Sequence, residues 1–466
     1  MIKGKTRIIL LALFFLVGIP QAPAQEPAFD RNGRPQNGLP AGVPTGDAAP
    51  EPDIQLTPSL TLGGRYDTKY ELERNFNLED DDDEDEVRLE PELTLSLSYE
   101  PQENFEGFLA AELKREYGFD VSEESETGPL RLELTEAYLD FDEVLEIGAG
   151  EIGIRAGRQR FDDEREWLYD ERLDGVRFFY QLDEPFAEAS ELTVELSVTR
   201  QNSFERQLLT NDGRDKINNY FLYAHYEADE VDIGELYELE DVQFAAYLFK
   251  RDQLNEDDED PLLMGIQSYA EVTEQLLYWL ELAHVRGERG ANDIHGYAVD
   301  LFGNYELEAP MKPSFVLGYA FATGDSDPDD GTDRNFRQTG LQDNQHSLDG
   351  NISFRYYGVL MEPELSNLQI LTAGAGIKPS ENVSVNLLYH QYRQHAAFDE
   401  LRDTNLDADP TGESRDIGSA IDLVSGIYFG HWALDVEVGY FMPGEAFDDD
   451  ENDNAFFTEL DLKFKF

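Results

Sequence analysis

Apolar and polar residues alternate one for one along many segments of this chain. The last seven residues, LDLKFKF (Leu460–Phe466), place leucine and phenylalanine on one face of an extended chain and charged residues on the other. ELTVELSVT (191–199) and HWALDVEVGYF (431–441) repeat the pattern. Because successive side chains of a β-strand point to opposite faces, this period predicts strands with one apolar face.

A soluble β-sandwich would show the same alternation, but three features favour a membrane barrel. The alternating segment 86–99 is more than twice as long as soluble strands, which usually have about five or six residues. Aromatic residues such as Tyr66, Tyr99 and Tyr440 recur near the ends of the apolar faces, where membrane barrels carry interfacial girdles. Connections between the segments alternate between short and long, and the long ones are acidic, which is typical of short periplasmic turns and long outside loops.

The N-terminus has the features of an export signal. A basic start precedes the apolar run 8–19 and the small-residue site APA (22–24). The apolar run is too short to cross a bilayer, which takes about 20 residues. A stretch rich in Pro, Gly, Asn and Ala follows, and we interpret it as a flexible linker or a loosely ordered plug. We therefore predict a signal peptide over residues 1–24, a periplasmic linker over 25–53 and an outer-membrane barrel over 54–466.

Nineteen segments are candidate strands, but bacterial single-chain barrels have an even number because both chain ends lie in the periplasm. Connections must alternate between periplasm and outside along the chain. Assigning them from the N-terminus and from the C-terminus gives the same outside loops only if segment 346–357 is not a wall strand. We predict an all-β transmembrane antiparallel β-barrel of eighteen strands with long acidic extracellular loops. In this prediction residues 324–366 form one long outside loop that can fold into the lumen, and sixteen strands is the alternative.

Charge and residue types exclude several function classes. The net charge of -63 opposes attraction to nucleic acid, and the absence of cysteine excludes disulfides and thiolate metal sites. The 40% hydrophobic and 12% aromatic content argues against a disordered chain. No H-E-x-x-H, G-x-S-x-G or phosphate-binding loop motif is present, so we expect neither an enzyme nor a cofactor.

Arginines on predicted lumen faces could guide an anion. Arg65, Arg88, Arg155 and Arg177 alternate with apolar residues and so face away from lipid in a barrel. The guanidinium group presents a planar set of donors that suits carboxylates, so spaced arginines could pass an anionic chain along. The alternative is that lumen Glu and Asp residues pair with these arginines and hold the barrel shape.

Five segments carry a resemblance to a known family: GRQR (157–160), REWLYDERLDGVRF (165–178), the Gly- and Asp-rich 318–344 with FRQTGLQ, PELSNLQ (363–369) and DIGSAIDLV (416–424). In these segments the chain resembles the alginate export porins of Gram-negative outer membranes, over about residues 55–466. The resemblance implies an eighteen-stranded barrel whose arginine-rich constriction passes an acidic polysaccharide. The matching positions are Arg158, Arg160, Arg177 and Arg337, and Arg355 is a further candidate because it alternates with aromatic residues. Arg158 and Arg160 are in phase with the preceding isoleucines unless a bulge intervenes.

We therefore predict a channel of the alginate-export type that passes an anionic polysaccharide by passive diffusion. Its expected surroundings are outer-membrane lipid and lipopolysaccharide, with periplasmic secretion partners and a monomeric barrel. A general or cation-preferring porin is the alternative, because Glu90, Glu92, Glu112, Glu195 and Glu437 are also predicted to face the lumen. A surface-binding barrel with a closed lumen is a further alternative.

A possible calcium loop occurs in DSDPDDGTD (325–333), where Asp325, Asp327 and Asp329 have the spacing of the first EF-hand ligands. The twelfth position is Phe336, where an EF-hand needs a bidentate glutamate. A solvated turn is the alternative interpretation of this segment.

Overall fold

The fold is described from a computed structural model of the chain, in which residues 43–466 form one compact unit. The structure describes residues 50, 53–79, 85–102, 104–119, 126–186, 189–201, 207–208, 217–233, 237–253, 259–273, 275–347, 352–448 and 451–466. The predicted signal peptide, most of the predicted linker and much of the acidic run near residue 80 lie outside these residues.

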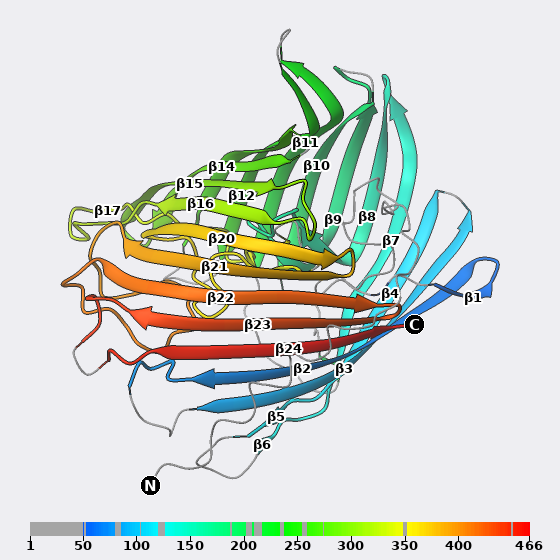
Figure 1. The fold of residues 1–466 in the computed structure, drawn as a ribbon. Coiled ribbons are helices and arrows are strands. Elements are labelled where there is room, and N and C mark those ends of the chain that lie inside the picture. Colours follow the sequence, from blue (N-terminus) through cyan, green and yellow to red (C-terminus); the bar gives the residue numbers. More distant parts are fainter. Residues whose placement is uncertain are drawn as a thin grey trace. The chain divides into compact units, whose positions relative to one another are not determined.

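Eighteen long antiparallel strands form the wall of a closed barrel (Figure 1). Each strand pairs with its neighbours in chain order, and β2 pairs with β24 to close the ring. The wall strands are β2 (Leu60–Arg74), β3 (Glu86–Gln102), β4 (Phe105–Lys114), β7 (Arg131–Ile147), β8 (Gly150–Asp162), β9 (Asp170–Asp183), β10 (Ser190–Gln201), β11 (Ile217–Ile233), β12 (Tyr237–Gln253), β13 (Leu262–Thr273), β14 (Leu276–Arg289), β15 (Asn292–Glu306), β16 (Ser314–Ala322), β20 (Leu368–Ser380), β21 (Val383–Gln394), β22 (Asp416–Phe429), β23 (Trp432–Pro443) and β24 (Ala455–Lys465).

Six short strands lie outside this wall. They are β1 (Ile54–Thr57), β5 (Tyr117–Gly118), β6 (Glu126–Thr127), β17 (Thr332–Asp333), β18 (Gln345–His346) and β19 (Phe354–Arg355). β18 and β19 pair only with each other. Among the described residues, no helix is long and apolar enough to cross a membrane.

The strand count confirms the prediction of eighteen, and the alternative of sixteen is wrong. Segment 346–357 is outside the wall, as the parity argument required, because β18 and β19 belong to a separate small sheet. The predicted barrel, residues 54–466, begins with a hairpin of β1 and β2 in which Ile54 pairs with Leu62. Pro58 lies at its turn, where it has no N–H to donate to a ladder.

The period of two separates an exposed outer face from a covered inner face. On β15, the outward side chains of Tyr297, Leu301 and Tyr305 are exposed, whereas the inward Asp300 and Asn304 are buried. The outer face of an isolated barrel is the face that lipid covers in a membrane. The same alternation on the other wall strands gives the barrel its apolar exterior and polar interior.

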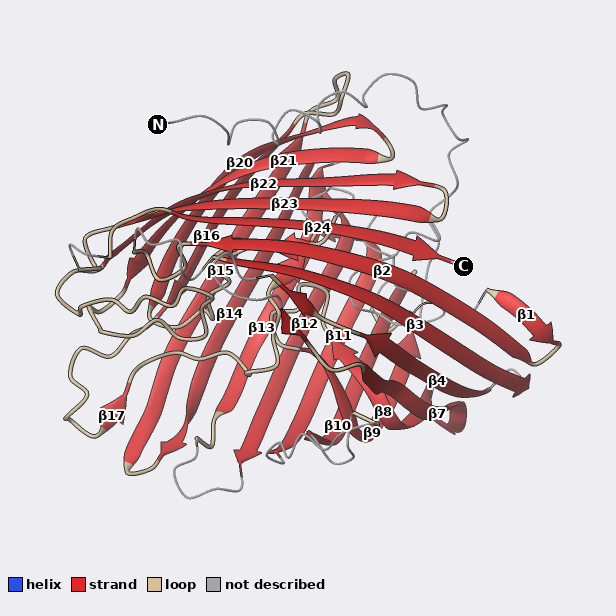
Figure 2. Ribbon diagram, turned by 90° about the horizontal axis from the view of Figure 1, so that it is seen from below, coloured by secondary structure: helices blue, strands red, loops and turns tan. Residues whose placement is uncertain are grey.

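Connections at the two ends of the barrel differ in length, as predicted. One end has short turns, which among the described residues include 148–149, 307–313, 381–382 and 430–431. The other end carries most of the long connections, including 323–367, 395–415 and 444–454. Figure 2 shows loops gathered at the end where β2 terminates. Short turns are periplasmic in outer-membrane barrels, so this second end is the extracellular one.

Candidate functional site in the lumen

The lumen-facing arginines predicted from the sequence are held by carboxylates. Arg177 forms two parallel hydrogen bonds to Glu195, from Nε to Oε1 at 2.9 Å and from Nη2 to Oε2 at 2.6 Å. Its guanidinium also lies 4.4 Å from the centroid of the Phe161 ring, and only 6% of the side chain is exposed. This geometry is the bidentate arrangement that gives the strongest arginine–carboxylate pairs.

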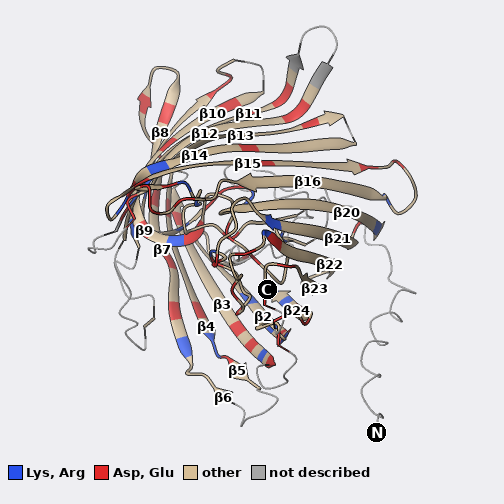
Figure 3. Ribbon diagram, turned by 90° about the vertical axis from the view of Figure 1, so that its left-hand side faces the viewer, with Lys and Arg blue, Asp and Glu red and all other residues tan. Residues whose placement is uncertain are grey.

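Three other predicted arginines on the wall have the same type of partner. Arg65 donates to Asp67 at 2.5 Å, and Arg155 donates from Nε to Asp140 at 2.7 Å. Arg88 lies 2.8 Å from Glu73, but 36% of its side chain remains exposed. Figure 3 shows acidic and basic segments intermixed along β3 and β4. The inner wall therefore carries alternating charges rather than a row of cations alone.

The GRQR arginines differ in phase from Arg155. The β8–β9 register is unbroken along this segment, so no bulge intervenes. Arg158 and Arg160 therefore stay in phase with Ile154. Arg158 makes a bidentate pair with Asp174, with Nε–Oδ1 and Nη2–Oδ2 distances of 2.8 and 3.0 Å. At the extracellular end of β8, Arg160 pairs with carboxylates of the 163–169 connection and of β9.

A cluster of three carboxylates surrounds the end of Arg160. Glu166, Asp170 and Asp343 each offer an oxygen within 4.8 Å of the others. Arg160 lies 3.0 Å from Glu166 and 2.5 Å from Asp170, so a cation already balances part of this charge. Burial raises the pKa of Glu166 well above its usual value, and the neighbouring Asp170 raises it further. The cluster is explained as an ion-pair network of the protein itself.

The connection 323–367 folds into the barrel and packs on its inner wall. The Val359 N–H donates to Asp422 of β22 at 3.1 Å, and the Tyr392 hydroxyl of β21 donates to the Tyr357 carbonyl at 2.8 Å. On another part of the wall, the Tyr357 hydroxyl donates to Asp300 of β15 at 3.0 Å. The loop thus joins inward faces from separate parts of the ring, as the predicted inward folding of 324–366 allowed.

A residue that the sequence argument gave no role joins the 163–169 connection to this loop. Arg165, in the REWLYD segment, lies 2.8 Å from Asp300 and 4.1 Å from the centroid of the Tyr356 ring. Trp167 donates from its indole nitrogen to the Tyr357 hydroxyl at 3.1 Å. The family segment was visible in the sequence, but its contacts depend on a loop almost two hundred positions away.

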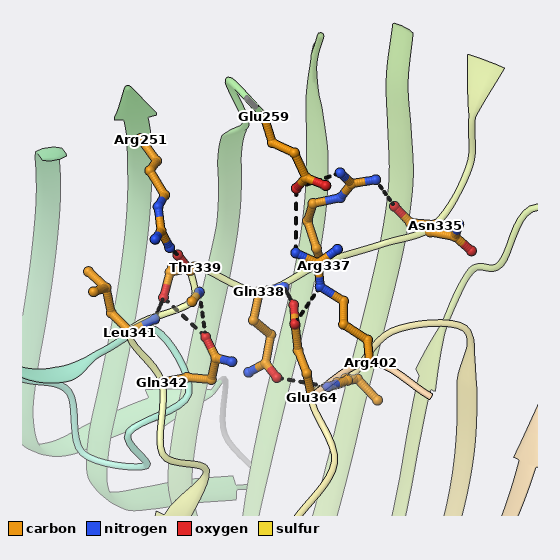
Figure 4. A network of polar contacts seen from close by, with 12 residues as sticks. Arg251, Glu259, Asn335, Arg337, Gln338, Thr339, Leu341, Gln342, Glu364 and Arg402 are labelled. Atoms are coloured by element: carbon orange, nitrogen blue, oxygen red, sulfur yellow. Dashed lines mark hydrogen bonds and ion pairs between the residues drawn. The ribbon is translucent and has the colours of Figure 1, made fainter. Parts of the chain in front are cut away.

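The FRQTGLQ segment anchors the lumen loop (Figure 4). Arg337 is only 1% exposed; it forms an ion pair with Asp333 and lies 2.7 Å from Glu259. The Gln338 N–H donates to Glu364 at 2.8 Å, and its side-chain amide donates to the Trp167 carbonyl at 2.8 Å. The segment is therefore almost completely buried among polar partners, which fixes the backbone of the loop.

Neighbouring loops and strands complete this network (Figure 4). Arg402, from the 395–415 connection, donates from Nε to Glu364 at 2.6 Å and from Nη2 to Glu259 at 3.4 Å. Arg251 of β12 donates to the Thr339 carbonyl at 2.7 Å. Glu259 carries a pKa below its usual value, because the charges of Arg337 and Arg402 outweigh the effect of burial. Its negative charge is thus part of the folded loop.

A polar cavity of about 180 Å³ opens between the loop 323–367 and the 395–415 connection. Its lining residues are Gln342, Asp343, Asn344, Arg355, Tyr357, Glu362, Pro363, Glu364, Asp403 and Asn405. Arg355 is the only one of the eight arginines predicted from the sequence that lines this cavity. Its Nη1 donates to Glu362 at 2.9 Å and its Nη2 to Asp343 at 3.3 Å, while 30% of the side chain stays exposed.

Burial raises the pKa of Glu362 in this cavity to about 7, although Arg355 acts to lower it. Asp343 contributes to the rise because a second carboxylate nearby disfavours the anion. The cavity can donate hydrogen bonds from Arg355 and accept them from its carboxylates and amides. Such a lining suits hydroxyl-rich groups, and the arginine suits a carboxylate if that group displaces a protein carboxylate.

The predicted calcium ligands are not brought together among the described residues. Asp325 accepts the N–H of Asp327 at 3.0 Å and lies 3.5 Å from the guanidinium of Arg334. Arg334 also lies 2.8 Å from Asp330. These contacts make the segment a turn closed by its own side chains, which is the alternative interpretation from the sequence.

Comparison with known proteins identifies the family. The family model described as alginate export matches residues 59–458. Two curated relatives, each named alginate production protein AlgE, are 29% identical over 156 residues in Azotobacter vinelandii and 26% identical over 173 residues in Pseudomonas aeruginosa. These matches cover 32% and 34% of this chain, and the chain spans only 31% and 34% of the two relatives.

Solved structures share the fold at low sequence identity. Pseudomonas aeruginosa OccK5 (OpdH) is 9% identical with a TM-score of 0.50, and the match covers 88% of this chain and 99% of that one. Pseudomonas aeruginosa OprD is 11% identical with a TM-score of 0.50, covering 90% and 99%. The closed barrel and its apolar exterior place the protein in the outer membrane of a Gram-negative cell. Since the family model matches nearly the whole barrel, the chain belongs to the alginate export family.

Proposed function

We propose that this protein is an outer-membrane channel that exports alginate or a closely related acidic polysaccharide. The observation that supports the proposal is the family match over 59–458, which spans nearly all of the closed barrel. The two AlgE relatives are named for alginate production, although each matches over only about a third of its length. An eighteen-stranded ring is wide enough to enclose both a packed loop and an aqueous path.

In this proposal the protein carries out no covalent chemistry and the polymer crosses by diffusion. Polymer carboxylates would exchange with protein carboxylates at luminal arginine and lysine groups, so each contact is weak enough to release the chain. Lipopolysaccharide surrounds the barrel, which acts as a monomer, and periplasmic secretion components deliver the polymer. Arg355, with its exposed guanidinium in the cavity, is the predicted path residue that best fits this exchange.

Single-channel recording tests the proposal. The purified barrel is inserted into a planar bilayer, and oligouronates from hydrolysed alginate are added on one side. We expect them to interrupt the current at concentrations about tenfold or more below those needed with maltohexaose, because only the uronate carries carboxylates for the luminal cations. Equal interruption by the two sugars would contradict a polyuronate path.

A cation-preferring porin is a second candidate, because carboxylates face one another across strands. Glu437 pairs in register with Glu459, which in turn lies opposite Glu71, and Asp435 lies opposite Asp461. Like charges directly opposite one another attract cations from solution. A reversal potential showing cation preference in a salt gradient, together with equal interruption by charged and neutral sugars, would favour this candidate.

A further inference from the structure

We propose that the water-filled path in the extracellular half of the lumen lies between the loop 323–367 and the inner faces of β24, β2 and β3. On this path Lys69, Arg88 and Arg355 are the cations that a polyanion meets. The identity of the polyanion rests on the proposed function, whereas the position of the path does not. Such a path runs along one side of the barrel and not through an arginine-lined centre.

One side of the lumen is filled by protein. Inward side chains of β14, β15, β20 and β22 are almost fully covered, with exposures of 0% for Glu281, 2% for Asp300, 6% for Thr372 and 0% for Asp422. Val359 of the loop bonds to Asp422, and Arg165 of the 163–169 connection pairs with Asp300. Glu281 and Thr372 bond to Tyr247 and His390 on the wall itself. Water and polymer therefore have no access to these four groups.

The side formed by β24, β2 and β3 keeps exposed inward groups. On β2 and β3, 37% of the Lys69 side chain and 36% of the Arg88 side chain are exposed, although both lie on the inward face with Glu71. Arg355 faces this side from the loop, because its charge interacts with those of Glu437 and Glu459 on β23 and β24. These exposed inward cations mark where we place the entry of water on this side of the ring.

Two of these cations, Lys69 and Arg88, share the carboxylate of Glu71, whereas Arg355 pairs with Asp343 and Glu362 of its own loop. Glu71 lies 3.7 Å from Lys69 and 3.5 Å from Arg88, and Lys69 also lies 3.3 Å from Glu459. Exposed pairs of this kind are weak, so an arriving carboxylate can exchange with a protein carboxylate at small cost. Breaking a buried pair such as Arg177–Glu195 would leave an uncompensated charge in a covered site. Arg177 is therefore a structural residue in this scheme, and the exposed cations contact the polymer.

Cysteine accessibility tests the position of the path without reference to any substrate. The chain has no cysteine, so each introduced thiol is unique. We expect a negatively charged methanethiosulfonate reagent added from the extracellular side to modify Lys69→Cys and Arg355→Cys and to change their currents. The Thr372→Cys variant, on the covered side, should not react until the protein is unfolded. Rapid modification of Thr372→Cys together with protection of Lys69→Cys would overturn the proposal.

Charge removal tests the contacts with polyanion. Lys69→Gln, Arg88→Gln and Arg355→Gln should each weaken interruption by oligouronate about two- to fivefold, as expected for partly exposed ion pairs. Lys312→Gln, in a short turn at the other end of the barrel, and Arg334→Gln, in the aspartate-rich turn, are matched controls that should stay at the wild-type value. Unchanged interruption in the triple variant would overturn the role of these cations. If wild-type channels do not distinguish oligouronate from maltohexaose, the proposed function fails, and the thiol experiment still decides the path.

Discussion

Single residues at the seam, where β2 pairs with β24, show how closure of the barrel restricts the sequence. Gly64 and Phe466 exchange two backbone hydrogen bonds of 2.9 Å where β2 meets the chain terminus. The Phe466 ring covers the glycine so closely that an added Cβ would overlap it. A terminal aromatic residue thus packs where the first wall strand meets the last, and a side chain at position 64 would have to displace its ring.

Substitution of Gly64 tests this packing. We expect Gly64→Ala to destabilise the barrel by about 1–3 kcal/mol, since overfilling a packed site displaces its neighbours. Urea unfolding in detergent, followed by the mobility difference between folded and unfolded barrels on gels, measures the change. Gly303→Ala is the matched control, because the nearest atom to its added Cβ is 3.7 Å away. Equal midpoints for the two variants would contradict the seam argument.

Substitution of Arg177 could change the stability of the barrel or the ion selectivity of the channel, and the two effects must be measured separately. Removing the arginine would leave Glu195 ionised and buried without its partner, a loss of about 3–5 kcal/mol. We expect Arg177→Ala to lower the urea midpoint strongly, and the double variant Arg177→Ala/Glu195→Ala to recover part of the loss. A double-mutant cycle gives the coupling energy. A wild-type midpoint combined with an altered reversal potential would instead make Arg177 a path residue.

At the scale of elements, the strands were predictable and the inner loops were not. The strands could be recognised from their period-two alternation. The requirement for an even number of strands then excluded 346–357 from the wall. The loop 323–367 has no such period, because its residues are placed by partners such as Arg251, Glu259 and Arg402 that are distant in sequence. Sequence alternation could assign an arginine to an inward face, but it could not show that Arg337 is 1% exposed while Arg355 remains accessible.

The cavity element has a pH dependence that follows from Glu362. Its pKa of about 7 in the docked loop exceeds the ordinary value of 4.5, mainly because of burial. The docked loop therefore binds this proton more tightly, so the contribution to docking is greatest below pH 4.5 and is lost as the pH rises to about 7. As the pH rises over this range, we expect amide hydrogen exchange in the segment around Glu362 to accelerate. The acceleration should exceed the increase in the intrinsic exchange rate over the same pH range.

The Glu362→Gln variant isolates that contribution from the other titrating groups in the loops. His346, whose pKa is lowered to about 4 by burial, acts in the opposite direction, and Asp163, raised to about 6, acts in the same direction. Subtracting the variant profile from the wild-type profile removes both effects. A difference profile that is flat between pH 4.5 and 7 would show that Glu362 does not titrate with docking.

For the whole molecule, the contacts of the lumen loop decide whether the channel is gated or permanently narrowed. Leu360 and Val359 pack on Gly439 of β23, and an added Cβ at Gly439 would lie 2.9 Å from the Leu360 Cβ. The dense polar anchoring of FRQTGLQ and the buried Val359–Asp422 contact favour a fixed inner wall over a movable plug. A fixed wall leaves the path along β2 and β3 unchanged during transport.

A disulfide between the loop and the wall tests this directly. Cβ atoms in disulfides are about 3.5–4.5 Å apart, so Leu360→Cys with Gly439→Cys needs only a small shift to form the bond. We expect the oxidised double variant to conduct within about twofold of its reduced form, because a loop that stays in place loses no motion that conduction requires. The single variant Leu360→Cys controls for the oxidant. A several-fold rise in conductance on reduction would mean that the loop leaves the lumen, and the pore would then open as a gate rather than run beside a fixed wall.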